Sequence, residues 1–502
     1  GTLNVLADGQ ATNHAYGVAG AGGLVSVPFS ASYTTTVSRT SATTGSKAAS
    51  QPGDPATITV DGLKLAATQS SSFDAWMTNT NASLVGVSGA RTENFARATT
   101  TAALGAESEI EAGTVQLDAS TTLNKGAPAG LLAGSGLLRP DWNVDSSSGG
   151  LADFPAAGSS TTLLADTLAG IGAGATVLAT SNNAATPGVR VDAHNDIGAT
   201  DRVKMASGGA VSAASGESVI STVCPPGEAA CTPGERPDAT VRVGDGARVE
   251  TVGDSDIAMG SRTRANLYSQ SAVDVYGLVG VAPEGRSTAV YDGDNRIEIG
   301  AASLRSERNI RLSAGAASDG TPNTLGATAR TDVFNNTAIP VNRDPVADAF
   351  VTSRSTVSVA VGADVAAVRN VALHAVEGSA GASGVGIGKD IYRETLAAIA
   401  SWFSNLFGGG DVSFETRTGR SGVSQDSAVD VRGTVRVGIE RKQLLHIDYD
   451  GSVIEQTDGI GIASTRMQDI YADILARIEA LRALIRDYAV SPGDTTSDAA
   501  IA

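Results

Sequence analysis

The sequence predicts an all-β protein, a right-handed parallel β-helix with helical insertions near its C-terminal end. Three observations predict this class: strand-sized runs recur along the chain, related phrases repeat, and the apolar residues are small. Aromatic residues make up only 4% of the 502 residues, whereas glycine occurs 59 times. Stacked thin layers need small and β-branched side chains in their interior, so this composition suits a β-solenoid.

The predicted strands are short runs in which apolar residues alternate with small or polar ones, the period-two pattern of a half-buried strand. Clusters of Gly, Asn, Asp and Ser, such as 292–295 and 450–451, indicate turns between them. The clearest runs are 24–27, 56–60, 84–87, 114–117, 239–243, 278–281, 296–299, 310–312, 355–361 and 434–439.

Repeated phrases indicate that the strands stack as copies of one unit. SAVDVYGLVGV at 271–281 returns as SAVDVRGTVRV at 427–437, which gives Asp274 and Asp430 equivalent places in the repeat. GLVSV at 23–27, SLVGV at 83–87 and GLVGV at 277–281 share a second pattern. Coils of about 20 to 25 residues would then build a rod of roughly 80 to 100 Å along the stack.

The predicted organisation is one continuous repetitive body with two interruptions. Residues 1–388 form β-helix repeats with loop excursions at 138–160 and 224–237, and strands resume over 411–463. Helical segments are expected at 389–410 and 464–490, and 491–502 is expected to lead into a further segment. Since the chain starts at Gly1, it is expected to be a processed product or a fragment.

Both predicted helices carry an apolar stripe at 4-3-4-3 spacing. The stripe either packs within the molecule or forms a partner face. Its members are Leu396, Ile399, Phe403 and Leu406 in the first helix and Ile470, Ile474, Ile478, Leu481 and Ile485 in the second.

The only two cysteines, Cys224 and Cys231, lie in a segment rich in Pro and Gly. This spacing favours a local disulfide that closes a surface loop, with free thiols as the alternative. A metal site is disfavoured because no Cys or His cluster accompanies the pair.

The charge balance excludes one class of partner. A formal net charge of −17 argues against nucleic-acid binding, which needs a basic surface. No run of about 18 apolar residues occurs, so no transmembrane segment is expected.

Candidate chemistry is sparse. His14, His194, His374 and His446 are far apart in sequence, and no Asp-Asp pair provides the clustered carboxylates of a polysaccharide-cleaving enzyme. No catalytic residue and no cofactor is therefore expected. Ca²⁺ at the acidic turns Asp292/Asp294 and Asp448/Asp450 is the one metal alternative, with solvated carboxylates favoured.

The block SAVDVRGTVRVGIERKQLLHIDYDGSV, the following TDGI and the segment DIYADILARIEALRALIRDYAV resemble the large bacterial filamentous adhesins of the leukotoxin-A and filamentous-haemagglutinin kind. The GLVSV and GLVGV phrases are similar to repeats of the same families. The resemblance implies a right-handed β-helix with helical insertions. It also implies export through an outer-membrane transporter by two-partner secretion or a related type V route.

These observations together predict a segment of a secreted, rod-like surface adhesin. It would attach by multivalent binding to a host cell, a neighbouring cell or a matrix, through protein or glycan contacts. Its location would be extracellular, on the bacterial cell surface. Two alternatives stay open: a structural stalk or filament component that displays another domain, and a β-helical enzyme that acts on polysaccharides.

Overall fold

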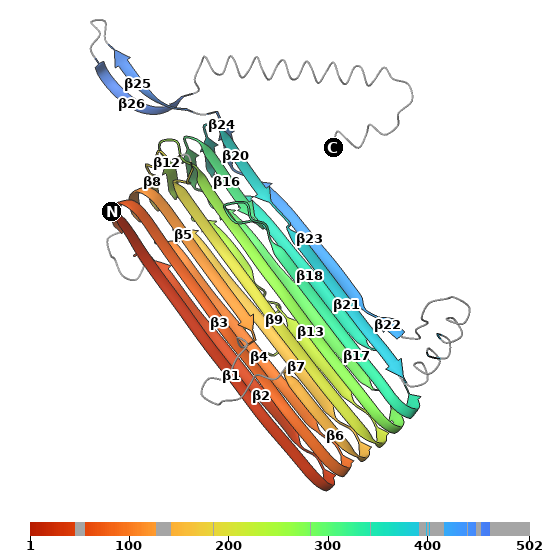
Figure 1. Cartoon of the computed structure of the whole chain (residues 1–502). Helices are drawn as coiled ribbons and strands as arrows, with labels where there is room; N and C mark the ends of the chain where they lie inside the picture. Colours follow the sequence, from red (N-terminus) through yellow and green to blue (C-terminus); the bar gives the residue numbers. More distant parts are fainter. Residues whose placement is uncertain are drawn as a thin grey trace, which may run out of the picture.

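The computed structural model is all-β and is built on two long parallel sheets (Figure 1). The structure describes residues 1–45, 56–126, 142–183, 185–281, 283–341, 343–390, 398, 401, 416–438, 440–447 and 453–461. Sheet A has 16 strands and sheet B has 8, and one antiparallel pair, β25 and β26, lies apart from both.

The strands of sheet A are β1 (Thr2–Ser26), β3 (Thr57–Gly86), β5 (Glu109–Lys125), β6 (Val144–Asp153), β8 (Thr176–Ala179), β9 (Val189–Ser212), β12 (Arg248–Thr251), β13 (Ile257–Val281), β15 (Ser303–Ser306), β16 (Asn309–Ala314), β17 (Thr324–Val341), β19 (Asp364–Ala367), β20 (Asn370–Ala375), β21 (Ser379–Asp390), β22 (Thr416–Thr418) and β24 (Thr434–Val437). Those of sheet B are β2 (Phe29–Thr43), β4 (Gly89–Leu104), β7 (Ala156–Ile171), β10 (Ser215–Ser221), β11 (Asp238–Val243), β14 (Glu284–Ile299), β18 (Val346–Val359) and β23 (Arg420–Val431). The separate pair is β25 (Glu440–Ile447) and β26 (Val453–Gly461).

The chain passes from sheet A to sheet B and back, and we call one such passage a circuit. Thr2 pairs with Gly62 and Val189 pairs with Ile257, so successive circuits are offset by 60 and 68 residues at these points. The predicted coil of 20 to 25 residues is therefore wrong, and the long dimension lies along the strands (Figure 1). Clusters of Gly, Asn, Asp and Ser that suggested turns continue the strands instead. Residues 292–295, for example, lie inside β14.

The two sets of repeated phrases have different outcomes. The second pattern stacks in register, because Val25 pairs with Val85 and Val279 pairs with Val211 in the same region of sheet A. The first pattern does not, since Asp274 lies on β13 in sheet A and Asp430 on β23 in sheet B. Their predicted equivalence is wrong because a separation of 156 residues is not a whole number of circuits.

Two predicted boundaries also differ from the structure. The excursion at 138–160 is wrong because β6 and the start of β7 occupy most of it, with small polar residues accepted inside a parallel strand. β21 runs through Lys389 and Asp390, so the first helix cannot begin at 389. The nine stripe residues predicted for the two helices lie outside the described residues, as do 491–502.

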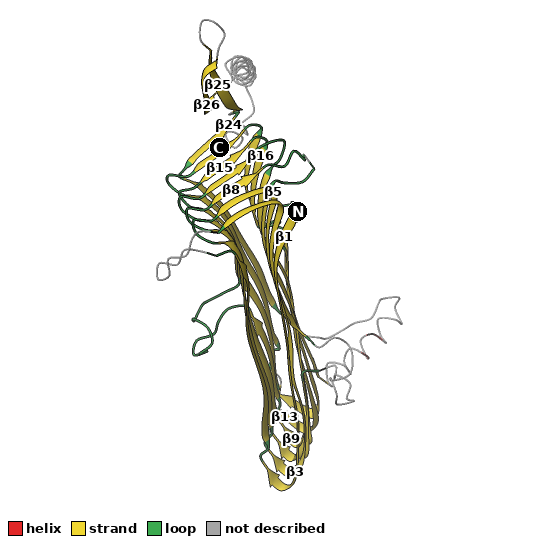
Figure 2. Cartoon of the chain, turned by 90° about the vertical axis from the view of Figure 1, so that its left-hand side faces the viewer, coloured by secondary structure: helices red, strands yellow, loops and turns green. Residues whose placement is uncertain are grey.

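The interior changes character along the strands. Figure 2 shows the sheets close together at the lower end and spread apart at the upper end, where the short strands β8, β15 and β24 lie. The wide upper end holds the largest apolar cluster, in which one inward column of paired residues is fully buried. That column contains Leu65, Leu117, Val191, Met259 and Leu312. Ala, Val, Leu, Ile and Met side chains fill the place where the sheets diverge.

Two rows of turns join the sheets, and we name them by their place in Figure 1. The lower turns lead from sheet A to sheet B, for example at 87–88 and 154–155. The upper turns lead back towards sheet A, for example at 172–175 and 244–247.

Candidate functional site

The most distinct feature of the outer surface is the loop between β10 and β11, residues 222–237, which we call the disulfide loop. It contains the predicted excursion at 224–237 and carries no strand. A disulfide joins Cys224 to Cys231, with the two Cα atoms 6.1 Å apart. Cys224 is buried against Phe95 and Leu164, so the loop is anchored on the outer face of sheet B.

Arg97 of β4 ties the loop to the sheet. Its guanidinium donates hydrogen bonds to the carbonyl oxygen of Ala230 at 3.1 Å, to Asp166 at 3.3 Å and to Glu235. Burial raises the pKa of Asp166 to about 6, with Arg97 opposing the rise and Glu235 adding to it. The loop is thus fixed both by a covalent bond and by a shared cation.

Beside this loop lies a groove of about 370 Å³ on the outer face of sheet B, which we call the loop groove. One side is Pro225–Glu228 of the loop, and the floor comes from β2, β4 and β7. Tyr33 is 58% exposed there, and Arg91 and Glu93 form an ion pair on the same strand face. Ser160 and Thr162 add hydroxyl groups.

This combination can bind a hydroxyl-rich ligand. An exposed aromatic ring offers a flat apolar face, while a guanidinium donates and a carboxylate accepts hydrogen bonds. Such a concave surface with a few convergent polar groups is the usual form of a binding site for a small molecule or a polymer segment.

A second cluster lies on the outer face of sheet A. Asp118 of β5 and Asp192 of β9 are paired neighbours, and His194 follows two residues after Asp192 on the same face. Burial raises the pKa of Asp118, whereas His194 opposes the rise, and burial lowers the pKa of His194. Within the described part of the chain, Asp118 Oδ1 and His194 Nδ1 are buried without a hydrogen-bond partner.

Asp192 itself is occupied by structural contacts. Its carboxylate accepts hydrogen bonds from the Ser318 backbone N–H at 2.8 Å, from Ser318 Oγ at 2.6 Å and from Arg190 Nε at 2.6 Å. Gly260, the next residue across the sheet, leaves the space for this loop, because a Cβ there would come within 2.1 Å of the Ser318 nitrogen. Asp192 therefore holds residues 315–323 against the sheet.

The predicted acidic turn at Asp292 and Asp294 is a strand segment whose carboxylates are paired with arginines. Asp292 contacts Arg354 at 2.7 Å, and Asp294 contacts Arg236 and Arg354 at 3.0 Å each and also Arg296. Burial alone would raise the pKa of Asp294, but these arginines lower it. Such pairing disfavours the Ca²⁺ alternative at this site. Asp448 and Asp450 lie outside the described residues.

No group of three or more His, Cys, Asp or Glu side chains that could hold a metal ion occurs among the described residues. The structure does not bring the histidines together: His14 packs beside Trp76 on the first two strands of sheet A, and His374 lies on β20. Nothing is described of the His446 side chain.

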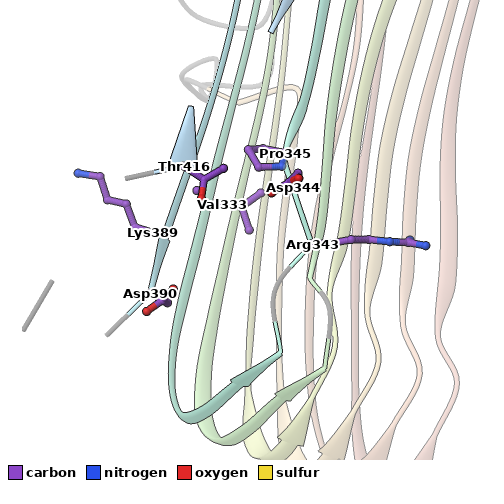
Figure 3. A pocket seen from close by; sticks show the side chains of 8 residues that line it. Val333, Arg343, Asp344, Pro345, Lys389, Asp390 and Thr416 are labelled. Atoms are coloured by element: carbon purple, nitrogen blue, oxygen red, sulfur yellow. The ribbon is translucent and has the colours of Figure 1, made fainter. Parts of the chain in front are cut away.

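Figure 3 shows a small hollow at the ends of β21 and β22, lined by Val333, Pro345, Asp390 and Thr416. Arg343 and Lys389 point away from one another at its margins. Its volume of about 20 Å³ leaves room for one water molecule, so it is too small for a ligand.

The groove residues were not predictable as a set. Tyr33, Arg91 and the Pro225–Glu228 segment are brought together only by the pairing of strands from different circuits. The sequence signal that pointed to this region was the pair of cysteines.

Comparisons with known proteins identify no relative: no protein-family model, no curated protein and no solved structure matches the chain. Among the described residues, no helix has the length and apolar character needed to cross a membrane.

Proposed function

We propose that this chain is a segment of a bacterial surface adhesin in which a right-handed parallel β-helix displays a binding groove. The succession of circuits through two parallel sheets supports the β-helix. A disulfide supports an oxidising, extracellular location, since such bonds persist outside the cytosol. The resemblance of residues 426–489 to filamentous adhesins supports export by a type V route.

The loop groove is the observation that carries the proposal. Most of sheet B is a regular surface, and the groove is a hollow of ligand size held open by a cross-linked loop. Its tyrosine, ion pair and hydroxyl groups suit a glycan of a host cell, a neighbouring cell or a matrix. Attachment would be multivalent, since many copies on one cell raise avidity by about 10²- to 10⁴-fold.

Binding of the purified full chain to a glycan array and to whole cells tests this function. Tyr33→Ala should lower the apparent affinity at least about tenfold, because it removes the ring on which a sugar packs. Tyr276→Ala is the matched control, since Tyr276 is 44% exposed on sheet A, away from the groove. Equal loss in both variants, or no binding by the wild type, would contradict the adhesin and favour a structural stalk.

A polysaccharide-cleaving function is the second candidate, and the cluster of Asp118, Asp192 and His194 favours it. Asp192 is engaged by Ser318 and Arg190, but Asp118, whose pKa burial raises, and His194, whose pKa burial lowers, can divide the acid and base roles. Asp118→Ala should then abolish the release of reducing ends from a polysaccharide panel. An unchanged or absent release in wild type and variant would dismiss the enzyme.

A further inference from the structure

The lower turns place apolar side chains outside and polar ones inside. Three residues of each of six turns point outwards, namely 24, 25 and 27; 84, 85 and 87; 151, 152 and 154; 210, 211 and 213; 278, 279 and 281; and 338, 339 and 341. The middle residues, from Val25 to Ile339, are paired across neighbouring strands, so the three residues of each turn form three columns. All positions in these columns are Leu, Val, Ile, Phe or Ala. We call this surface the apolar turn row.

The leucine column shows the exposure of this row. It contains Leu24, Leu84, Leu151, Ala210, Leu278 and Ala338, each directly before a paired residue of the middle column. The exposed fractions of the four leucines are 75%, 48%, 57% and 58%. The neighbouring columns contain Val, Ile and Phe residues that are also exposed. The apolar area is on the order of 1,000 Å², above the roughly 300–600 Å² of the largest patch on a typical monomer.

These apolar residues are not exposed because the core lacks room for them. Between the second and third columns, each turn directs one residue inwards, and these include Ser26, Gly86, Asp153 and Ser212. Asp153 is fully buried and accepts hydrogen bonds from Ser148 Oγ at 2.5 Å and Ser207 Oγ at 2.7 Å. The sequence thus puts Ser, Asp, Gly or Pro where a core would carry large apolar residues, and apolar residues where a surface would be polar.

We propose that the apolar turn row is a self-association surface on which a second copy of this chain packs, row against row. The area matches the roughly 800 Å² per partner of a stable interface. A two-fold axis lets one row of equally spaced ridges, about 4.8 Å apart, interdigitate with an identical row.

The charge of the protein favours a second copy of the chain, rather than a lipid bilayer, as the partner of this surface. Two molecules of net charge −17 can approach closely only through a surface free of carboxylates, and the three columns contain none. They contain no Lys or Arg either. Binding to the surface of an anionic membrane normally relies on such basic residues.

Sedimentation velocity of the full chain over roughly 1–100 μM tests the proposal. The wild type should dimerise, and the triple variant Leu84→Glu/Leu151→Glu/Leu278→Glu should be monomeric, with dimerisation weakened at least about a hundredfold. Val361→Glu is the matched control: Val361 is 72% exposed but lies on an upper turn, so this variant should dimerise like the wild type.

Two further measurements decide between partners and guard against misfolding. In an otherwise native chain, Ala210→Cys should be cross-linked between copies by a short thiol reagent, whereas Ala301→Cys on an upper turn should not. Neutral phosphatidylcholine vesicles should leave the wild type in solution. A monomeric wild type, cross-linking through Ala301→Cys alone, or flotation with vesicles that the triple variant loses would overturn the proposal.

Discussion

The upper and lower turns are made by the same chain at opposite ends of the same strands, yet they distribute polarity in opposite ways. At the upper turns, large apolar residues such as Ile171 and Val243 point inwards. Apart from the exposed Val361, the residues outside are small or charged, and Gly246 adopts the left-handed conformation, with φ of 72°. At the lower turns, Asp153 and Asn81 are buried while Leu84 and Leu151 are exposed.

This difference indicates that the upper and lower turns have different roles in the molecule. The upper turns close a wide apolar interior and need only a tight reversal of the chain, for which glycine suffices. The lower turns close a narrow interior with hydrogen bonds, which leaves their outer side chains available for contact. The comparison predicts at which residues of the two ends a substitution lowers the free energy of unfolding most.

The largest effect is expected at the buried ion pair of Lys125 and Asp201, which lies between the apolar cluster that contains Ile197 and the one that contains Val203. The Nζ–Oδ1 distance is 2.9 Å, and both side chains are fully buried. Asp201→Ala leaves an unpaired buried ammonium, so the free energy of unfolding should fall by about 3–5 kcal/mol. Chemical denaturation measures it. The double variant Lys125→Met/Asp201→Leu should recover most of the loss; if it does not, packing rather than charge is responsible.

Leucines at the two ends give the next contrast. Leu117 in the upper core is fully buried, so Leu117→Ala should lower the free energy of unfolding by about 2–5 kcal/mol. Leu84→Ala, the same change on a lower turn, should alter it by less than about 0.5 kcal/mol in dilute monomer. Similar losses in denaturant titrations of the two variants would show that the lower leucines belong to the core.

The polar interior of the lower end is tested by Asp153→Ala. Ser148 and Ser207 would lose their shared acceptor, and the free energy of unfolding should fall by about 1–3 kcal/mol. Hydrogen exchange should show faster opening around the lower turns than around the upper ones. Asp145→Ala, on the outer face of the same strand, is the control and should be nearly neutral. Uniform acceleration along the strands would remove the distinction between the two ends.

How much of the fold and of the candidate site could be predicted from the sequence depends on how far apart the contacting residues lie along the chain. Cys224 and Cys231 are seven positions apart, so they were recognisable as a pair, and the GLVSV and GLVGV phrases were recognisable as repeats that stack. The length of a circuit could not be predicted, because Ser- and Gly-rich stretches such as Val144–Asp153 have the composition of loops. Contacts such as Arg97 with Ala230 join residues 133 apart, and only the register of the sheets makes them neighbours.

Asp166 tests whether the burial of a carboxylate alone determines its effect on the free energy of unfolding, or whether the charged partner determines it, as at Asp201. Asp201 has its own buried lysine, whereas Asp166 shares Arg97 with Glu235. Burial raises the pKa of Asp166 to about 6, above its ordinary value of 3.8, so the folded state holds this proton more tightly than the unfolded state. The corresponding stability is fully present below the unfolded pKa and is lost as the pH rises through about 6.

Asp166→Asn stays uncharged, so it should not lose stability in that window. Between about pH 4 and 6.5, the free energy of unfolding of the variant should therefore rise relative to that of the wild type, by an amount on the order of 1 kcal/mol after solvent screening. Urea titrations of both proteins at a series of pH values measure the difference. A variant that is instead less stable at pH 7 would mean that the Arg97 contact outweighs burial, and that Asp166 resembles Asp201 after all.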